Sequence, residues 1–111
     1  MISVSTDRDG GVAVVAVSGE VDLATGPVMG DAISRALALD GVETVRVDLS
    51  ALQFLDSSGI ALLLKARRDA DGRGVAFRIF GAQGVPLQVL ELTGVWEHLH
   101  GETTPDQPGA L

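Results

Sequence analysis

Residues 44–72 read TVRVDLSALQFLDSSGIALLLKARRDADG, in which a strand pattern passes through a polar loop into a helix pattern. The run Thr44–Leu49 is rich in apolar, β-branched residues, which is typical of a strand. Ser50–Asp56 is expected to form the loop. Ser57 then opens a helix whose apolar residues recur at helical spacing until Gly72 stops it. A strand followed by a helix of this length is the basic unit of an α/β fold.

The segments before this unit predict a hairpin and a helix. Ile2–Thr6 alternates apolar and polar residues, as an edge strand does, and Asp9–Gly11 supplies the turn. Val12–Val17 is continuously apolar, so we expect a strand that is covered on both faces. Thr25 is placed to cap a helix by accepting a backbone N–H, and that helix runs to Leu39.

The segments after it complete the domain. Val75–Phe80 predicts a strand, Val85–Leu92 a short helix, and Val95–Leu99 a last short strand. Together the elements predict a single α/β domain over residues 1–102. Its sheet is mixed but mostly parallel, with four to five strands, an N-terminal hairpin and helices packed on it. Thr103–Leu111 contains two prolines and few apolar residues, which predicts a flexible C-terminal tail.

The amino-acid composition limits the classes of function that this protein can have. The 111 residues are 46% apolar and include 8 Lys and Arg against 15 Asp and Glu, a formal charge of −7. An apolar fraction this high excludes a disordered chain, and the negative charge argues against binding nucleic acid or an anionic membrane. The sequence has no cysteine, no secretory signal pattern and no apolar run of about 20 residues. We therefore expect a soluble, cytoplasmic protein without a cofactor.

The segment Asp56-Ser57-Ser58-Gly59 stands where the loop becomes a helix. The carboxyl edge of a parallel sheet is a common binding edge, and the first turn of a helix favours negative charge. A serine there could accept a phosphate without disrupting the fold. Serine and aspartate before a helix are also ordinary caps, and the order of residues does not separate these two roles.

Three motifs in order resemble one family. VRVDLSALQFLDSSGIALLLKARRDADGRG is similar to the central strand, loop and helix of STAS domains, specifically the bacterial anti-sigma factor antagonists. VSGEVDLATGP resembles the segment between their second strand and first helix, and VAFRIFGAQGVPLQVLELTGV resembles their next strand and helix. The resemblance runs from about Val12 to Val95 and implies the STAS fold.

The resemblance also implies a function. In these antagonists the second serine of the D-S-S-G motif, Ser58 here, is phosphorylated by a partner that is both anti-sigma factor and serine kinase. That partner supplies ATP and Mg, and a serine phosphatase reverses the modification. The unphosphorylated protein binds the kinase and frees its sigma factor. The matching partner-binding positions are Glu20, Asp22, Thr25, Asp56, Ser57 and Gly59.

Other functions are less well supported. A serine hydrolase would need a G-x-S-x-G elbow and a base, and only His98 and His100 could serve as the base. Those two histidines do not make a metal site, and we expect neither catalysis nor a bound metal. One alternative shares the fold: a STAS module that is not phosphorylated and instead senses a small ligand or acts in a larger signalling assembly. The family usually ends in a fifth strand and a C-terminal helix, for which Gly101–Leu111 is short and proline-rich.

Overall fold

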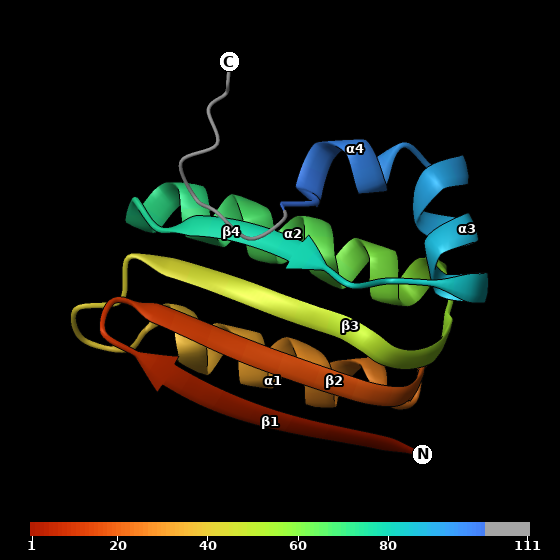
Figure 1. Ribbon diagram of the computed structural model, residues 1–111, viewed down its shortest axis with the longest axis horizontal. Helices are drawn as coiled ribbons and strands as arrows, with labels where there is room; N and C mark the ends of the chain where they lie inside the picture. Colours follow the sequence, from red (N-terminus) through yellow and green to blue (C-terminus); the bar gives the residue numbers. More distant parts are fainter. Residues whose placement is uncertain (102–111) are drawn as a thin grey trace.

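A computed structural model of the protein describes residues 1–101 (Figure 1). The predicted tail at 103–111 and the last residue of the predicted domain lie outside the described residues. The helices and strands, in chain order, are β1 (Ile2–Asp9), β2 (Val12–Val21), α1 (Gly26–Leu37), β3 (Thr44–Leu55), α2 (Ser57–Arg73), β4 (Ala76–Phe80), α3 (Gly84–Leu92) and α4 (Val95–Leu99).

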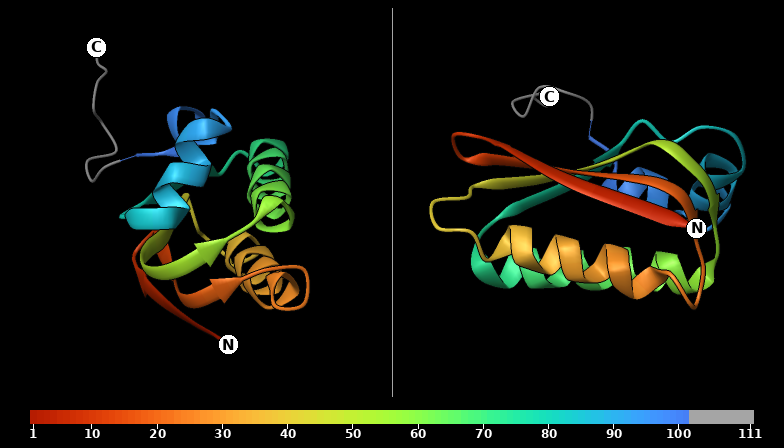
Figure 2. Two further views of the ribbon diagram at one scale, coloured as in Figure 1. Left: turned by 90° about the vertical axis from the view of Figure 1, so that its right-hand side faces the viewer. Right: turned by 90° about the horizontal axis from the view of Figure 1, so that it is seen from below.

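The four strands lie in the order β1-β2-β3-β4. β1 is antiparallel to β2, whereas the pairs β2–β3 and β3–β4 are parallel. Helices α1 and α2 lie side by side against one face of this sheet, and α3 and α4 lie beyond its β4 edge (Figures 1 and 2). The predicted α/β class, the hairpin and the edge position of the first strand are therefore confirmed.

The core lies between the sheet and the two long helices. Alternate residues of the central strands point into it and are buried: Ala13, Val15 and Val17 of β2, and Val45, Val47 and Leu49 of β3. The other residues of β2, Val12, Val14 and Ala16, are only half-buried. The prediction that Val12–Val17 is covered on both faces is therefore wrong, because no helix within residues 1–101 lies over the second face (Figure 2).

The largest correction concerns the predicted loop at Ser50–Asp56, since β3 continues to Leu55. This part of β3 pairs with the end of β2, and the register shifts twice along it. Leu52 and Leu55, three residues apart, are the buried positions here. A strand whose buried residues are three apart does not show the period of two by which strands are recognised in sequence.

The remaining corrections concern the ends of helices and the last element. α1 ends at Leu37 instead of Leu39. α2 passes through Gly72 and ends at Gly74, whose φ of 72° allows the left-handed helix cap. Val95–Leu99 forms a helix and not the predicted strand, and His100 after it makes a single parallel bridge to Ile79 of β4.

Candidate functional site

The carboxyl ends of β2 and β3 bring two of the predicted site segments together. Val21 at the end of β2 pairs with Leu55 at the end of β3. One residue further on, the Asp56 N–H donates to the Val21 carbonyl at 3.3 Å. The end of β2, with Glu20, and the loop after it, with Asp22 and Thr25, therefore lie beside the start of α2, as expected for neighbouring parallel strands.

Asp56 caps α2 and holds the Ser58 hydroxyl. Its backbone is extended, and its Oδ1 atom accepts hydrogen bonds from the N–H groups of Ser58 at 3.0 Å and Gly59 at 3.3 Å. The same Oδ1 accepts a hydrogen bond from the Ser58 hydroxyl at 2.6 Å. The cap is thus Asp56 and neither serine, which leaves both hydroxyls available for another role.

The three residues that open α2 differ in their access to solvent. Ser57 is exposed, Ser58 is half-buried, and Gly59 is buried. A Cβ atom on Gly59 would lie 2.4 Å from the Leu55 Cδ1 atom and 2.7 Å from the Val21 Cγ1 atom. Gly59 was predicted to take part in partner binding, which stays a prediction; the structure shows that it is buried and that its lack of a side chain lets α2 approach the ends of β2 and β3.

Asp22 and Thr25 form a local network of hydrogen bonds. The Asp22 Oδ1 atom accepts from the N–H groups of Ala24 at 3.0 Å and Thr25 at 2.9 Å, while the Asp22 N–H donates to the Thr25 Oγ1 atom at 2.9 Å. Thr25 stands at the N-cap position of α1, as predicted, but the predicted side-chain cap is wrong, because its side chain accepts no hydrogen bond from the first turn of that helix. The backbone hydrogen bond from Thr25, followed by the one from its side chain, lowers the pKa of Asp22 below its ordinary value of 3.8. Glu20 is exposed, and its carboxylate lies 3.6 Å from the N-terminal ammonium group.

Three exposed apolar side chains lie at the same end of the sheet as this site, and they were not predicted from the sequence. Leu23 between β2 and α1 is 80% exposed, Phe54 at the end of β3 is 42% exposed, and Val85 at the start of α3 is 50% exposed. We call these three residues, together with the loops at the carboxyl ends of β2, β3 and β4, the carboxyl edge. Large exposed apolar side chains at the same end of a sheet as polar ones are typical of a surface that binds another protein.

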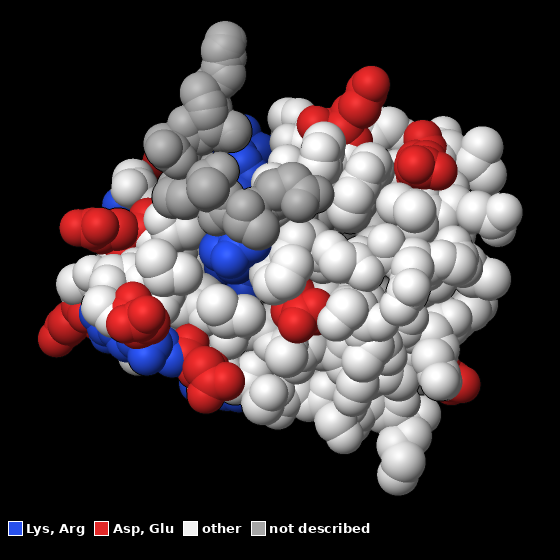
Figure 3. Space-filling model, viewed as in Figure 1, with Lys and Arg blue, Asp and Glu red and all other residues white. Residues whose placement is uncertain are grey.

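The carboxyl edge also lacks lysine and arginine. None of the eight Lys and Arg residues falls within 19–34, 47–64 or 79–111. Three acidic residues lie at this edge: Glu20 near the end of β2, and Asp22 and Asp56 in the loops. In Figure 3 the blue surface lies in the left half of the molecule, whereas the right half, toward the carboxyl ends of β2 and β3, shows only white and red. The gap in Lys and Arg is visible in the sequence and could have indicated this surface.

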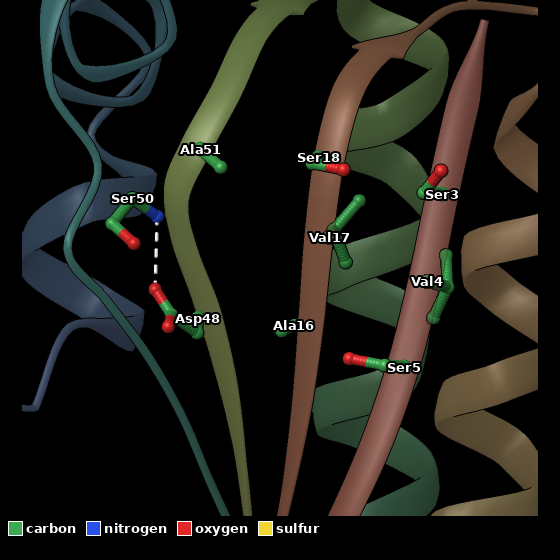
Figure 4. Close-up of a pocket in the computed structure, with 9 residues that line it drawn as sticks. All are labelled: Ser3, Val4, Ser5, Ala16, Val17, Ser18, Asp48, Ser50 and Ala51. Carbon is green, nitrogen blue, oxygen red and sulfur yellow. Dashed lines mark hydrogen bonds between the residues drawn. The ribbon is translucent and has the colours of Figure 1, made fainter.

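A shallow hollow of about 150 Å³ lies elsewhere, on the uncovered face of the sheet (Figure 4). It is lined by Ser3, Val4, Ser5, Ala16, Val17, Ser18, Asp48, Ser50 and Ala51. None of the residues of the D-S-S-G segment lines it. A pocket beside the D-S-S-G segment would favour the alternative function of sensing a small ligand, but this hollow does not lie beside that segment.

The described residues show neither a metal-binding cluster nor a membrane-spanning helix. Within residues 1–101 no three His, Asp or Glu side chains are grouped so that they could hold a metal ion. His98 and His100 are exposed, as predicted for surface residues. Over the same range, no helix combines the length and the apolar character needed to cross a membrane.

A family model, curated relatives and solved structures all match this chain. The family model described as "Mlab, STAS domain" matches residues 4–100. The anti-sigma-F factor antagonist RsfB of Mycobacterium tuberculosis is 33% identical over 94 residues, which cover 85% of this chain and 75% of RsfB. The crystal structure of an anti-sigma factor antagonist from Mycobacterium paratuberculosis matches with a TM-score of 0.82 at 30% identity, over 96% of this chain and 89% of that one. SpoIIAA of Bacillus in its phosphorylated form matches with a TM-score of 0.69 at 20% identity, over 94% of each chain, and at that identity it shares the fold.

Proposed function

This chain belongs to the STAS domain family, which confirms the resemblance carried by its three motifs, and from that premise we propose that it is an anti-sigma factor antagonist. Its unmodified form binds an anti-sigma factor that is also a serine kinase, so that the sigma factor is released in the cytoplasm. The kinase supplies ATP and Mg and phosphorylates Ser58, which weakens the complex, and a serine phosphatase restores it. The named relatives are antagonists, regulators that act by binding and not by catalysis.

One observation carries this proposal: the Ser58 hydroxyl is half-buried and not enclosed, and it lies at the first turn of α2 beside Asp56. A buried hydroxyl could not reach the active site of a kinase. The dipole of α2 favours negative charge at this position, although the N–H groups of Ser58 and Gly59 already donate to Asp56. The helix would therefore remain folded when Ser58 carries a phosphate.

The hydrogen bond between Ser58 and Asp56 supports a switch. Phosphorylation removes the proton that the Ser58 Oγ atom donates, because the Oγ atom becomes an ester oxygen. It also brings about −1.5 to −2 charges close to a carboxylate whose Oδ1 atom lies 2.6 Å from that Oγ atom. The two anions repel each other, so one of them must turn outward into the carboxyl edge.

The composition of the carboxyl edge supports the same effect. Burying a dianion among Leu23, Phe54 and Val85 in an interface removes its water without supplying a partner for its charge. Repulsion and desolvation of this kind can cost several kcal/mol, and about 1.4 kcal/mol changes affinity tenfold. The acidic residues at this edge would pair with basic residues of the partner.

The first experiment locates the modification. The protein is incubated with candidate anti-sigma kinases and ATP, and the modified residue is mapped by mass spectrometry. We expect phosphate on Ser58 in the wild type and in Ser57→Ala, a matched control for a neighbouring serine, and none in Ser58→Ala. We also expect Ser58→Ala to bind the kinase as tightly as wild type, and Ser58→Asp at least about tenfold more weakly. Modification at Ser57, or equal affinity of all variants, would contradict the proposal.

A second experiment tests the surface. Leu23→Ser removes the most exposed apolar side chain of the carboxyl edge, and we expect binding to the kinase to weaken about tenfold or more. The matched control is Leu39→Ser, which changes an exposed leucine after α1, at the other end of the parallel strands. Equal affinities of these two variants would place the partner on another surface.

A further inference from the structure

The outer side of β1 presents unpaired backbone groups. β1 is the first strand in the sheet order, and Figure 1 shows it at the border of the molecule. The Met1 carbonyl accepts a hydrogen bond from the Glu20 N–H at 3.0 Å, so Met1 and Glu20 form a hydrogen-bonded pair of the antiparallel ladder. Such pairs alternate along the ladder, so the N–H and C=O groups of Ile2, Val4 and Thr6 point away from β2.

Within residues 1–101, this outer edge lacks the usual protection against pairing. Proteins protect exposed strand edges with lysine, proline, bulges or covering segments, and Ile2–Thr6 contains no charge and no proline. The opposite edge of the sheet is different. β4 carries Arg78, the Gly101 N–H donates to the Ile79 carbonyl at 2.9 Å, and α4 packs against the strand.

We propose that β1 pairs with β1 of a second copy of this chain, antiparallel and about a two-fold axis at Val4. The register follows from the ladder, because a symmetric hydrogen-bonded pair needs a residue whose backbone groups point outward. Val4 then pairs with Val4 of the other copy, and each Ile2 pairs with Thr6. The two four-stranded sheets become one continuous sheet.

The side chains of β1 fit this register. Ile2 and Val4 are half-buried, pack against the core and point to the helix side of the sheet, so an apolar seam continues from one copy to the next. Ser3 and Ser5 are exposed on the uncovered face and would lie opposite each other across the axis. The charged residues Asp7–Asp9 lie outside the five paired positions. An axis at Thr6 would instead place Val4 opposite Arg8.

The exchange of Ser3 and Ser5 for charged residues tests both the dimer and its register. Across the axis each residue 3 faces residue 5 of the other copy. Ser3→Lys/Ser5→Lys therefore creates two repulsive pairs, whereas Ser3→Lys/Ser5→Asp creates two attractive pairs with the same exposed positions. In sedimentation experiments we expect the mass of the wild type to rise with protein concentration. We expect the dissociation constant of the dimer to be about tenfold or more larger for the Lys/Lys variant. For the Lys/Asp variant it should be equal to the wild-type value or smaller.

A second pair of variants tests the backbone contacts. Thr6→Pro removes an outward N–H that β2 does not use, and we expect it to abolish association. Thr6→Val keeps that N–H and should associate like the wild type. Thermal unfolding of each variant shows whether the monomer is intact. A wild type that stays monomeric up to about millimolar concentration, where even weak complexes form, would overturn the proposal, as would equal association of the Lys/Lys and Lys/Asp variants.

Discussion

Replacement of Asp56 tests the geometry of the D-S-S-G segment. Asp56→Ala removes the Oδ1 atom that accepts hydrogen bonds from the Ser58 N–H, the Gly59 N–H and the Ser58 hydroxyl. Loss of an N-cap costs about 1 kcal/mol, within a range of roughly 0.5–2 kcal/mol. The hydroxyl loses a bond to a charged acceptor but regains water because it is half-exposed, which adds about 0.5 kcal/mol. We expect the free energy of unfolding to fall by about 1.5 kcal/mol, within a range of roughly 1–2.5 kcal/mol, or by about 6 °C in melting temperature.

Asp56→Asn is the matched control, because asparagine is as good an N-cap as aspartate. It keeps the oxygen acceptor and loses only the interaction between the carboxylate charge and the α2 dipole, about 0.5 kcal/mol. Urea unfolding of the three proteins, followed by circular dichroism, measures the differences. The reasoning is refuted if Asp56→Ala stays within about 0.5 kcal/mol of wild type, or if Asp56→Asn loses as much as Asp56→Ala.

Three further predictions concern stability. Gly59→Ala places a methyl group against two buried side chains, so we expect a loss of about 1–3 kcal/mol in urea unfolding, and an unchanged midpoint would mean that the packing there relaxes freely. Gly72→Ala, in the same helix but with open space at its Cβ position, should gain about 0.4–1 kcal/mol by the same measurement, and a loss would contradict the helical geometry at that residue. The pKa of Asp22 is lower in the folded protein than its ordinary 3.8, so its stabilising contribution is present above 3.8 and is lost as the pH falls through the lowered value. Unfolding measured across that acid range should therefore depend less on pH in Asp22→Asn than in wild type, and parallel profiles would show that the hydrogen bonds to Asp22 are not maintained in solution.

The strands and helices that could be predicted are those in which apolar residues follow one clear pattern along the sequence. Val12–Val17 is a continuous apolar run and Val75–Phe80 is apolar except for Arg78, and both form strands, β2 from Val12 to Val21 and β4 from Ala76 to Phe80. Val95–Leu99 is too short for its period to separate a helix from a strand, and packing against the β4 edge decides in favour of the helix. The end of β3 was missed because its register relative to β2 is set by pairing and not by its own sequence.

Some residues of the candidate site could also be predicted from the sequence, and others could not. Asp56 and Ser58 are two residues apart, so local sequence was enough to place them at one helix start. Glu20, Asp22 and Thr25 were grouped with them only through the family resemblance, and the parallel pairing of β2 with β3 explains why they lie beside the start of α2. Exposure of Leu23 and Phe54 could not be read from the sequence, because an apolar residue beside a buried strand is more often part of the core. Only the assembled chain shows which apolar residues remain at the surface.

Only Asp56 separates the end of β3 from the first turn of α2, and the cap leaves that residue little conformational choice. Ser58 is therefore held by a short, hydrogen-bonded connection, and in the proposed complex docking would require no ordering of the backbone around it. Complexes between preformed surfaces of this kind differ mainly in how long they last, and less in how often productive encounters occur. The consequence for a phosphorylated form is kinetic: the two proteins would still meet at a comparable rate, and the modification would be expressed chiefly as a shorter residence time.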